Sequence, residues 1–276
     1  MVGVETAAEV TMPGGVAVDD GRRRDAALRP VVGADEAFLL DAEALAPVER
    51  STALLARCLV RLGPWEPPGD EQVRWLAVGD REALLLHLRR LTLGDRLELV
   101  LSCPACGEAL GLDLRVGELL LPPYEDWAPE HSVPVDGMRV RFRLPTGSDL
   151  EAAARAAAVD PGDGVRVVLE RCVLAAEGAL ELPRAAADAV AARMAELDPQ
   201  AEVVLDMPCA ICGHRFTVTV DAGELLAREL ADRADVLLHE IHLLALHYGW
   251  QESELLEMGT RRRRRYVAYL AEAIRR

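Results

Sequence analysis

The chain has 276 residues, of which 51% are hydrophobic and only 4% aromatic, so Leu, Val and Ala must fill its core. Its net charge of −15 argues against general nucleic-acid binding, because such binding needs a basic face. No apolar run reaches the roughly 18 residues that cross a bilayer, and residues 1–20 do not resemble a signal peptide. We therefore expect reduced thiols and a cytoplasmic location, in a bacterium given the abundance of Ala, Gly and Arg and the absence of Lys.

The N-terminal part predicts β-like pieces followed by helices. The expected elements are short β-like pieces within 7–31, helices near 34–42 and 46–62, a Pro/Gly loop at 64–72 and a strong helix at 81–92. Asp80 is the expected N-cap of this last helix, and Gly94 ends it. Cys58 lies in an apolar helical pattern, as does Cys172 further on, which indicates small core residues rather than metal ligands.

Two hairpins with a cysteine turn flank an inserted segment. Each has period-2 alternation of apolar residues on both sides of a Cys-x-x-Cys-Gly turn, at 96–115 and at 201–220. Between them the sequence predicts a strand at 137–144 and helices at 148–158, 164–176 and 183–197. Ser148 to Glu151 fits a capping box for the first of these helices, and Pro183 is expected at the first position of the last. The C-terminal part predicts only helices, at 222–248, 251–258 and 260–275.

The two turns repeat at a fixed interval. Cys103-Pro104-Ala105-Cys106-Gly107 and Cys209-Ala210-Ile211-Cys212-Gly213 lie 106 positions apart (209 − 103), and their flanking apolar residues repeat without a gap. Each turn supplies two thiolates, and structural zinc takes four ligands in a tetrahedron. We therefore expect one structural zinc ion, with Cys103, Cys106, Cys209 and Cys212 as its ligands. Two separate redox pairs, disulfides and unligated thiols are the competing interpretations, and neither pair has the strand-then-helix context of a thioredoxin-like site.

These patterns predict an α+β fold organised around a split four-cysteine zinc ribbon made of two β-hairpin knuckles. Helical N-terminal, inserted and C-terminal segments surround it. The expected segments are an N-terminal β/helical region (1–95), the first knuckle hairpin (96–120), the inserted strand and helices (121–200), the second knuckle hairpin (201–221) and the C-terminal helices (222–276). No low-complexity linker divides them, so we expect one globular unit.

The motifs that suggest catalysis lack the partner residues or the spacing that such chemistry needs. Pro208-Cys209-Ala210-Ile211-Cys212 matches half of a zinc deaminase signature, but the preceding 60 or so residues lack the His-x-Glu or Cys-x-Glu partner. His239-Glu240-Ile241-His242 has the wrong spacing for a zincin, and with His247 it is better explained as the polar edge of an amphipathic helix. His214 follows the second turn, where a surface role is expected because four cysteines are already present.

Arg261 to Arg265 form the one dense basic run. The run lies early in a predicted helix, where cations oppose the helix dipole. This misfit suggests acidic neighbours, either within this acidic chain or on a partner.

Several segments in order resemble a known family. They are Leu28-Arg29-Pro30, Gly79 to Leu85 with Leu88 to Leu91, the first cysteine turn, Phe142 to Gly147, the second cysteine turn, and Glu240 to Ala245 with Tyr248-Gly249-Trp250. The arrangement resembles the baseplate hub assembly chaperone family of T-even-type contractile phages and related bacterial contractile injection systems. The resemblance implies a protein without enzyme activity that binds baseplate or hub proteins, and it gives the four cysteines a zinc-ligand role. It leaves open whether the protein stays in the finished particle.

Three classes of function remain from the sequence. The favoured one is an assembly or interaction protein with structural zinc, which binds neither nucleic acid, nor a membrane, nor a small-molecule substrate. A zinc-ribbon nucleic-acid-binding regulator is the alternative, and Glu98, Glu108 and Asp113 around the first turn count against it. A metalloenzyme is the third, which four sulfur ligands would exclude because no coordination position stays open.

Overall fold

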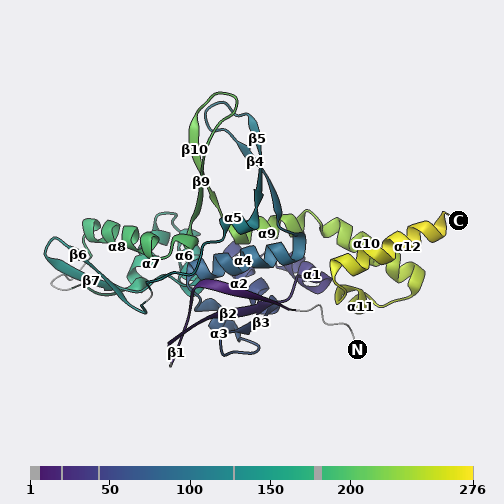
Figure 1. Cartoon of the computed structure of the whole chain (residues 1–276), viewed down its shortest axis with the longest axis horizontal. Helices are drawn as coiled ribbons and strands as arrows, with labels where there is room; N and C mark the ends of the chain where they lie inside the picture. The colour runs from purple at the N-terminus through teal and green to yellow at the C-terminus, as the bar shows by residue number, and fades with distance from the viewer. Residues whose placement is uncertain (1–6, 20, 43, 127, 177–181, 276) are drawn as a thin grey trace.

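The structure is a computed structural model that describes residues 7–19, 21–42, 44–126, 128–176 and 182–275. In these ranges it is a mixed α+β protein with two three-stranded and two two-stranded sheets, all antiparallel. The two-stranded hairpins rise together from the body, and a helical arm ending at the C-terminus extends to one side (Figure 1).

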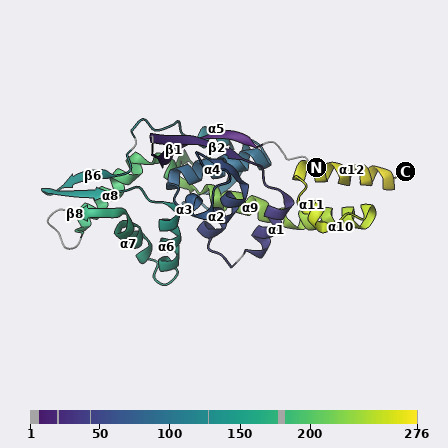
Figure 2. The ribbon, with the colours of Figure 1, turned by 90° about the horizontal axis from the view of Figure 1, so that it is seen from below.

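The same five elements occur twice along the chain. The first set is β1 (Ala8–Val18), β2 (Gly21–Leu28), α1 (Gly33–Asp41), α2 (Pro47–Cys58) and β3 (Leu59–Leu62). The second set is β6 (His131–Val135), β7 (Met138–Phe142), α6 (Gly147–Ala157), α7 (Asp163–Cys172) and β8 (Val173–Ala176). Their sheets have the matching orders β1-β2-β3 and β6-β7-β8. We call these two sets the first and second unit; they lie in different parts of the molecule (Figures 1 and 2).

Each unit is followed by a helical segment, a hairpin and another helix. After the first unit come α3 (Asp70–Arg74), α4 (Val78–Leu93), β4 (Arg96–Ser102), β5 (Ala109–Arg115) and α5 (Val116–Leu119). After the second come α8 (Arg184–Leu197), the short 3-10 helix η1 (Pro199–Ala201), β9 (Val203–Pro208), β10 (Arg215–Val220) and α9 (Ala222–Ala231). The chain is therefore an internal duplication, closed by a C-terminal arm of α10 (Ala234–Tyr248), α11 (Glu252–Leu256) and α12 (Thr260–Ile274).

A buried ion network marks the duplication at the level of single residues. Its members are Arg29, Asp35, Arg57 and Cys58 in the first unit and Arg143, Asp149, Arg171 and Cys172 in the second, 114 positions later (143 − 29). In both units the first arginine holds the aspartate with two nitrogens, and the second arginine donates through Nε. Both cysteines are fully buried, which confirms their predicted place in the core.

Helix α4 runs through the main core. Its Leu84 and Leu88 have no exposed surface, and the cluster around them includes the bases of both hairpins, for example Leu97 and Val220. The second unit has a smaller core of its own around Phe142 and Val190, and the C-terminal arm has a third around Leu244.

Two helix pairs each contact the first helix of the other unit. The residue before α4, Ala77, bridges to Thr146 at the start of α6, and the residue before α12, Gly259, bridges to Val32 at the start of α1. Thus α3 packs mainly on α2, and α4 mainly on β1, η1 and α9, while their junction reaches the start of α6 in the second unit. In the same way α12 packs mainly on α10, while α11 and the start of α12 reach α1 of the first unit. Buried arginines sit at both contacts: Arg81 of α4 is 2% exposed and Arg263 of α12 is 1% exposed.

Three predicted helices end earlier than the sequence suggested. The helix expected over 46–62 ends at Cys58, because residues 59–62 pair with β2, and the helix expected over 164–176 ends at Cys172 for the same reason, through β7. The helix expected over 222–248 is two helices. The first packs on the main core and the second on the core of the arm, so one apolar pattern covers two different contacts.

Two predicted caps also differ. Asp80 lies inside α4, whose N-cap is Ala77, and Asp80 instead accepts hydrogen bonds from the backbone N–H groups of Gly14 and Gly15. The capping box of α6 begins at Thr146 rather than Ser148. For Asp80 a contact distant in sequence replaces the local cap, whereas the capping box of α6 is still local and pairs Thr146 with Asp149.

Candidate metal centre

Four cysteines meet at the tips of the two hairpins. The Sγ atoms of Cys103, Cys106, Cys209 and Cys212 lie within 4.8 Å of one another. The first cysteine of each turn is closest to the second cysteine of the other, at 3.7 Å for Cys103 to Cys212 and 3.8 Å for Cys106 to Cys209. The arrangement therefore follows the duplication, with each copy contributing half of the group.

The turns that present the sulfurs have the same backbone hydrogen bonds. The N–H of Gly107 donates to the carbonyl of Cys103, and that of Gly213 donates to the carbonyl of Cys209, both at 2.9 Å. These glycines have φ of +75° and +74°, a left-handed conformation in which a Cβ would be strained. The sequence requirement for glycine after each second cysteine thus has a local cause.

The geometry fits a tetrahedral metal. A zinc–sulfur distance of about 2.3 Å in a tetrahedron separates the sulfurs by about 3.8 Å, close to the two short distances here. A disulfide needs about 2.05 Å between sulfurs, so the group is not a pair of disulfides. Four thiolates with no carboxylate or imidazole among them are a donor set typical of structural zinc.

Electrostatics also favours a cation at this point. The N–H groups of Cys212 and Ile211 point to the sulfur of Cys209 and lower the pKa of that thiol to about 7. The Glu108 N–H acts in the same direction on Cys106, but burial and the three neighbouring sulfurs outweigh it and raise the pKa of Cys106 to about 12. Four sulfurs this close cannot all be anionic without a positive charge between them.

Other candidate residues do not join this group. His214 contributes its carbonyl, which accepts from the N–H of Cys209, while its side chain is exposed. His239, His242 and His247 are exposed on α10, and no second group of three potential ligands comes together in the described ranges. The arginine run is divided: Arg263 is buried between Glu36 and Glu240, and its neighbours in the run are exposed.

The buried networks of the two units were missed from the sequence. Their signal was present, because an arginine six residues before an aspartate and an Arg-Cys pair 22 and 23 residues after it both recur at the same interval. The matching residues are few and lie in a background of Ala and Leu, so the pattern was visible only at the cysteine turns.

Together these features define a class of duplicated α+β protein whose halves meet at a closed group of four sulfurs. Comparison with known families agrees. The family model described as T4 bacteriophage base plate protein matches residues 25–177, more than half of the chain, and the chain belongs to this family. Searches of curated proteins and of solved structures find no match.

Family membership gives the chain a structural or assembly role in a baseplate, in association with other baseplate proteins. The resemblance seen in the sequence is confirmed at this level, while the hub and the chaperone role stay predictions. None of the helices in the described part of the chain combines the length and apolar composition that crossing a bilayer requires.

Proposed function

We propose that this chain is a zinc-stabilised assembly factor or component of the baseplate hub in a phage-like contractile tail or injection system. It acts by binding other proteins and has no enzyme activity. The family match over residues 25–177 is the observation that carries the baseplate role. The convergence of four sulfurs from two hairpins supports the zinc, with Cys103, Cys106, Cys209 and Cys212 as its ligands.

A zinc held by four sulfurs stabilises the fold and does no Lewis-acid chemistry, because no position is open to a water or substrate. Here the ion joins hairpins from the two copies of the duplication. Both hairpins are already fixed at their bases, where Leu97 and Val220 belong to the main core. The metal therefore holds the tips of the projection rather than the body.

A nucleic-acid-binding role is less compatible with the surface of the hairpins. Arg96 pairs with Asp113 at 2.8 Å, and in the second hairpin the Arg215 guanidinium pairs with Asp206 at 2.5 Å. These arginines are neutralised by their own hairpin, so they do not provide the free positive charge that phosphate binding needs.

The zinc proposal is tested by metal analysis of protein prepared without chelator. We expect one zinc per chain in the wild type and none in the double variant Cys106→Ser and Cys212→Ser. The variant Cys58→Ala, which removes a thiol outside the site, should keep one zinc. The cobalt-substituted protein should show an absorption spectrum typical of four thiolates, and a spectrum with oxygen or nitrogen ligands would contradict the proposal.

The baseplate role is tested by co-expression with the other baseplate proteins of the same contractile system. We expect a stable complex with at least one of them that survives purification and weakens when zinc is removed. The absence of any such complex, with all components soluble and folded, would overturn the proposed function even if zinc were present.

A further inference from the structure

The helix pair α11–α12 of the arm is a counterpart of α3–α4. Each pair begins with a five-residue helix, makes an antiparallel bridge to the residue before the first helix of a unit and places one buried arginine there. A Cβ added to Gly147 would lie 2.5 Å from Arg81 Nη1, and one added to Gly33 would lie 2.8 Å from Arg263 Nη1. The bridges and the arginines set the same register, so positions of α4 and α12 can be compared one by one.

On α4, the side that carries Asp80 is covered by a strand. Strand β1 packs on α4, and Asp80 fixes it by accepting the N–H groups of Gly14 and Gly15 at 2.7 and 2.8 Å. Further along the same side of the helix, Leu84 is fully buried and His87 is 8% exposed. Helix α4 is thus completed by an extended segment laid across this side.

The corresponding side of α12 is only partly covered, by Trp250, whose ring meets the ring of Tyr266 edge-on at 4.9 Å between centroids. In this register, the α12 residues equivalent to Asp80, Leu84 and His87 of α4 are Arg262, Tyr266 and Tyr269. Tyr269 is 49% exposed and Arg262 is exposed. The main contact of α12 is with α10, and no strand from the described residues lies along it. The arm projects away from the body, so this side is open to a partner (Figure 1).

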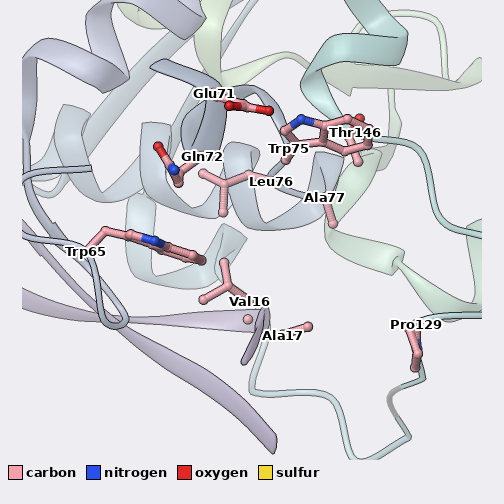
Figure 3. Close-up of a pocket in the computed structure, with 11 residues that line it drawn as sticks. Val16, Ala17, Trp65, Glu71, Gln72, Trp75, Leu76, Ala77, Pro129 and Thr146 are labelled. Carbon is pink, nitrogen blue, oxygen red and sulfur yellow. The ribbon is translucent and has the colours of Figure 1, made fainter. Parts of the chain in front are cut away.

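Both helix pairs carry a groove at the same place, and only one groove has its second wall. Beside α3 the groove is lined by Gln72, Trp75 and Leu76, and Figure 3 shows Val16 and Ala17 of β1 across it. Beside α11 the equivalent positions are Glu254, Glu257 and Met258, and they line a groove of about 390 Å³ with Trp250, Arg262 and Tyr266. The wall that β1 supplies in the first groove is missing from the second.

The charge on α12 indicates what would complete it. Arg262 and Arg265 make no ion pair with any described residue, and their guanidinium groups lie over the rings of Tyr266 and Tyr269, 5.9 and 5.8 Å from the centroids. Where α4 has an acid that binds backbone N–H groups, α12 has cations that favour carboxylates. The Nε of Arg265 donates to the Tyr269 hydroxyl at 2.9 Å, but neither Arg262 nor Arg265 has its charge neutralised by a described carboxylate. In a chain of net charge −15, two such arginines beside two tyrosines have the charge that complements an acidic protein segment.

We propose that the Arg262–Tyr269 side of α12 binds an extended acidic segment of another baseplate protein, placed as β1 is placed on α4. This inference rests on the proposed function, because it takes the partner to be a baseplate protein. The β1 strand of a second copy is not the occupant, since it carries only the acid Glu9 and is already packed on its own α4. Glu254 and Glu257 on the α11 side of the groove oppose the continuous charge of a phosphate backbone, whereas a peptide can place its acids at the arginines and its backbone N–H groups at the two glutamates.

The test uses the full chain with a photo-crosslinking amino acid in place of Tyr269, co-expressed with the baseplate proteins of its own system. We expect adducts that map to one extended segment containing Asp or Glu. The double variant Arg262→Glu and Arg265→Glu should weaken the complex at least about tenfold, because each attractive pair becomes repulsive. The matched variant Arg184→Glu and Arg193→Glu, with the same charge change on α8, should stay within about twofold.

Restoration decides whether the effect is direct. Replacing the crosslinked acid of the partner by Arg should restore binding to the Arg262→Glu and Arg265→Glu protein, whose unchanged zinc content shows that it is folded. Adducts with a second copy, adducts with a segment lacking acids, or undiminished binding by the double variant would overturn the inference and leave the proposed function standing. Failure of the wild type to bind any baseplate protein would overturn both.

Discussion

The variant Asp149→Asn tests whether each of the duplicated ion networks stabilises the unit that contains it. Asp149 is fully buried and accepts five hydrogen bonds from nitrogen and oxygen donors: two from Arg143, one from Arg171, and two from the backbone and hydroxyl of Thr146. An asparagine has one acceptor oxygen, and its NH₂ group would face arginine donors. The substitution therefore keeps the volume of the side chain and removes most of its bonds.

The expected loss is about 3 kcal/mol. Breaking a buried ion pair on one side costs about 3–5 kcal/mol. The lower end applies because the side chains of Arg143 and Arg171 are 21% and 39% exposed and can turn partly to water. The same arrangement surrounds Asp35, so Asp35→Asn should cost a similar amount.

The pH dependence has a defined sign. Burial raises the pKa of Asp149, but hydrogen bonds from Arg143, Thr146 and Arg171 outweigh it and hold the pKa well below its usual range. A carboxyl with a lowered folded-state pKa stabilises the protein above its unfolded pKa of about 3.9, and the contribution is lost as pH falls below that value. The difference between wild type and Asp149→Asn should therefore be constant near neutral pH and shrink below about pH 4.

The assay is urea unfolding followed by circular dichroism, with hydrogen exchange of α6 and α7 as a local readout. Asp206→Asn, which removes an exposed ion pair with Arg215, is the control and should cost much less. If Asp149→Asn cost no more than the control, the network would be incidental and the reasoning from burial would be wrong.

Three further outcomes are expected. Removal of zinc should raise hydrogen exchange in β4, β5, β9 and β10 while α4 stays protected, and equal loss of protection in α4 would contradict a site that holds only the tips. Gly79→Ala should lower Tm by about 3 °C or more, because its Cβ would lie 1.9 Å from Asp198 Oδ1, whereas Gly164→Ala in α7, which has room, should not. Burial raises the pKa of Asp80 to about 7, so the stability it contributes should fall as pH rises from about 4 to 7; Asp80→Asn should abolish this part of the pH dependence, and an unchanged profile would contradict it.

The features that could be predicted from the sequence are those whose signals lie close together along the chain. The cysteine turns were predictable because spacing, glycine and alternating apolar residues all lie within about twenty positions of chain. The end of α2 at Cys58 was not, because residues 59–62 become a strand only by pairing with β2. The position of Asp80 misled for a related reason: an acid near the start of a helix is usually a cap, but here its partners are Gly14 and Gly15, far away in sequence.

The duplication links the predicted metal to the rest of the fold. Neither copy alone can supply four sulfurs, so a closed site forms only when both hairpins are folded and adjacent. The helix pairs also link the two copies, because α3–α4 contact the start of α6 and α11–α12 contact the start of α1. Removing one copy would therefore take away two contacts of the other copy, the one before its first helix and the one at the tip of its hairpin. The α12 helix contacts the first unit at its start and α10 along its length, and its remaining face is where we place the partner.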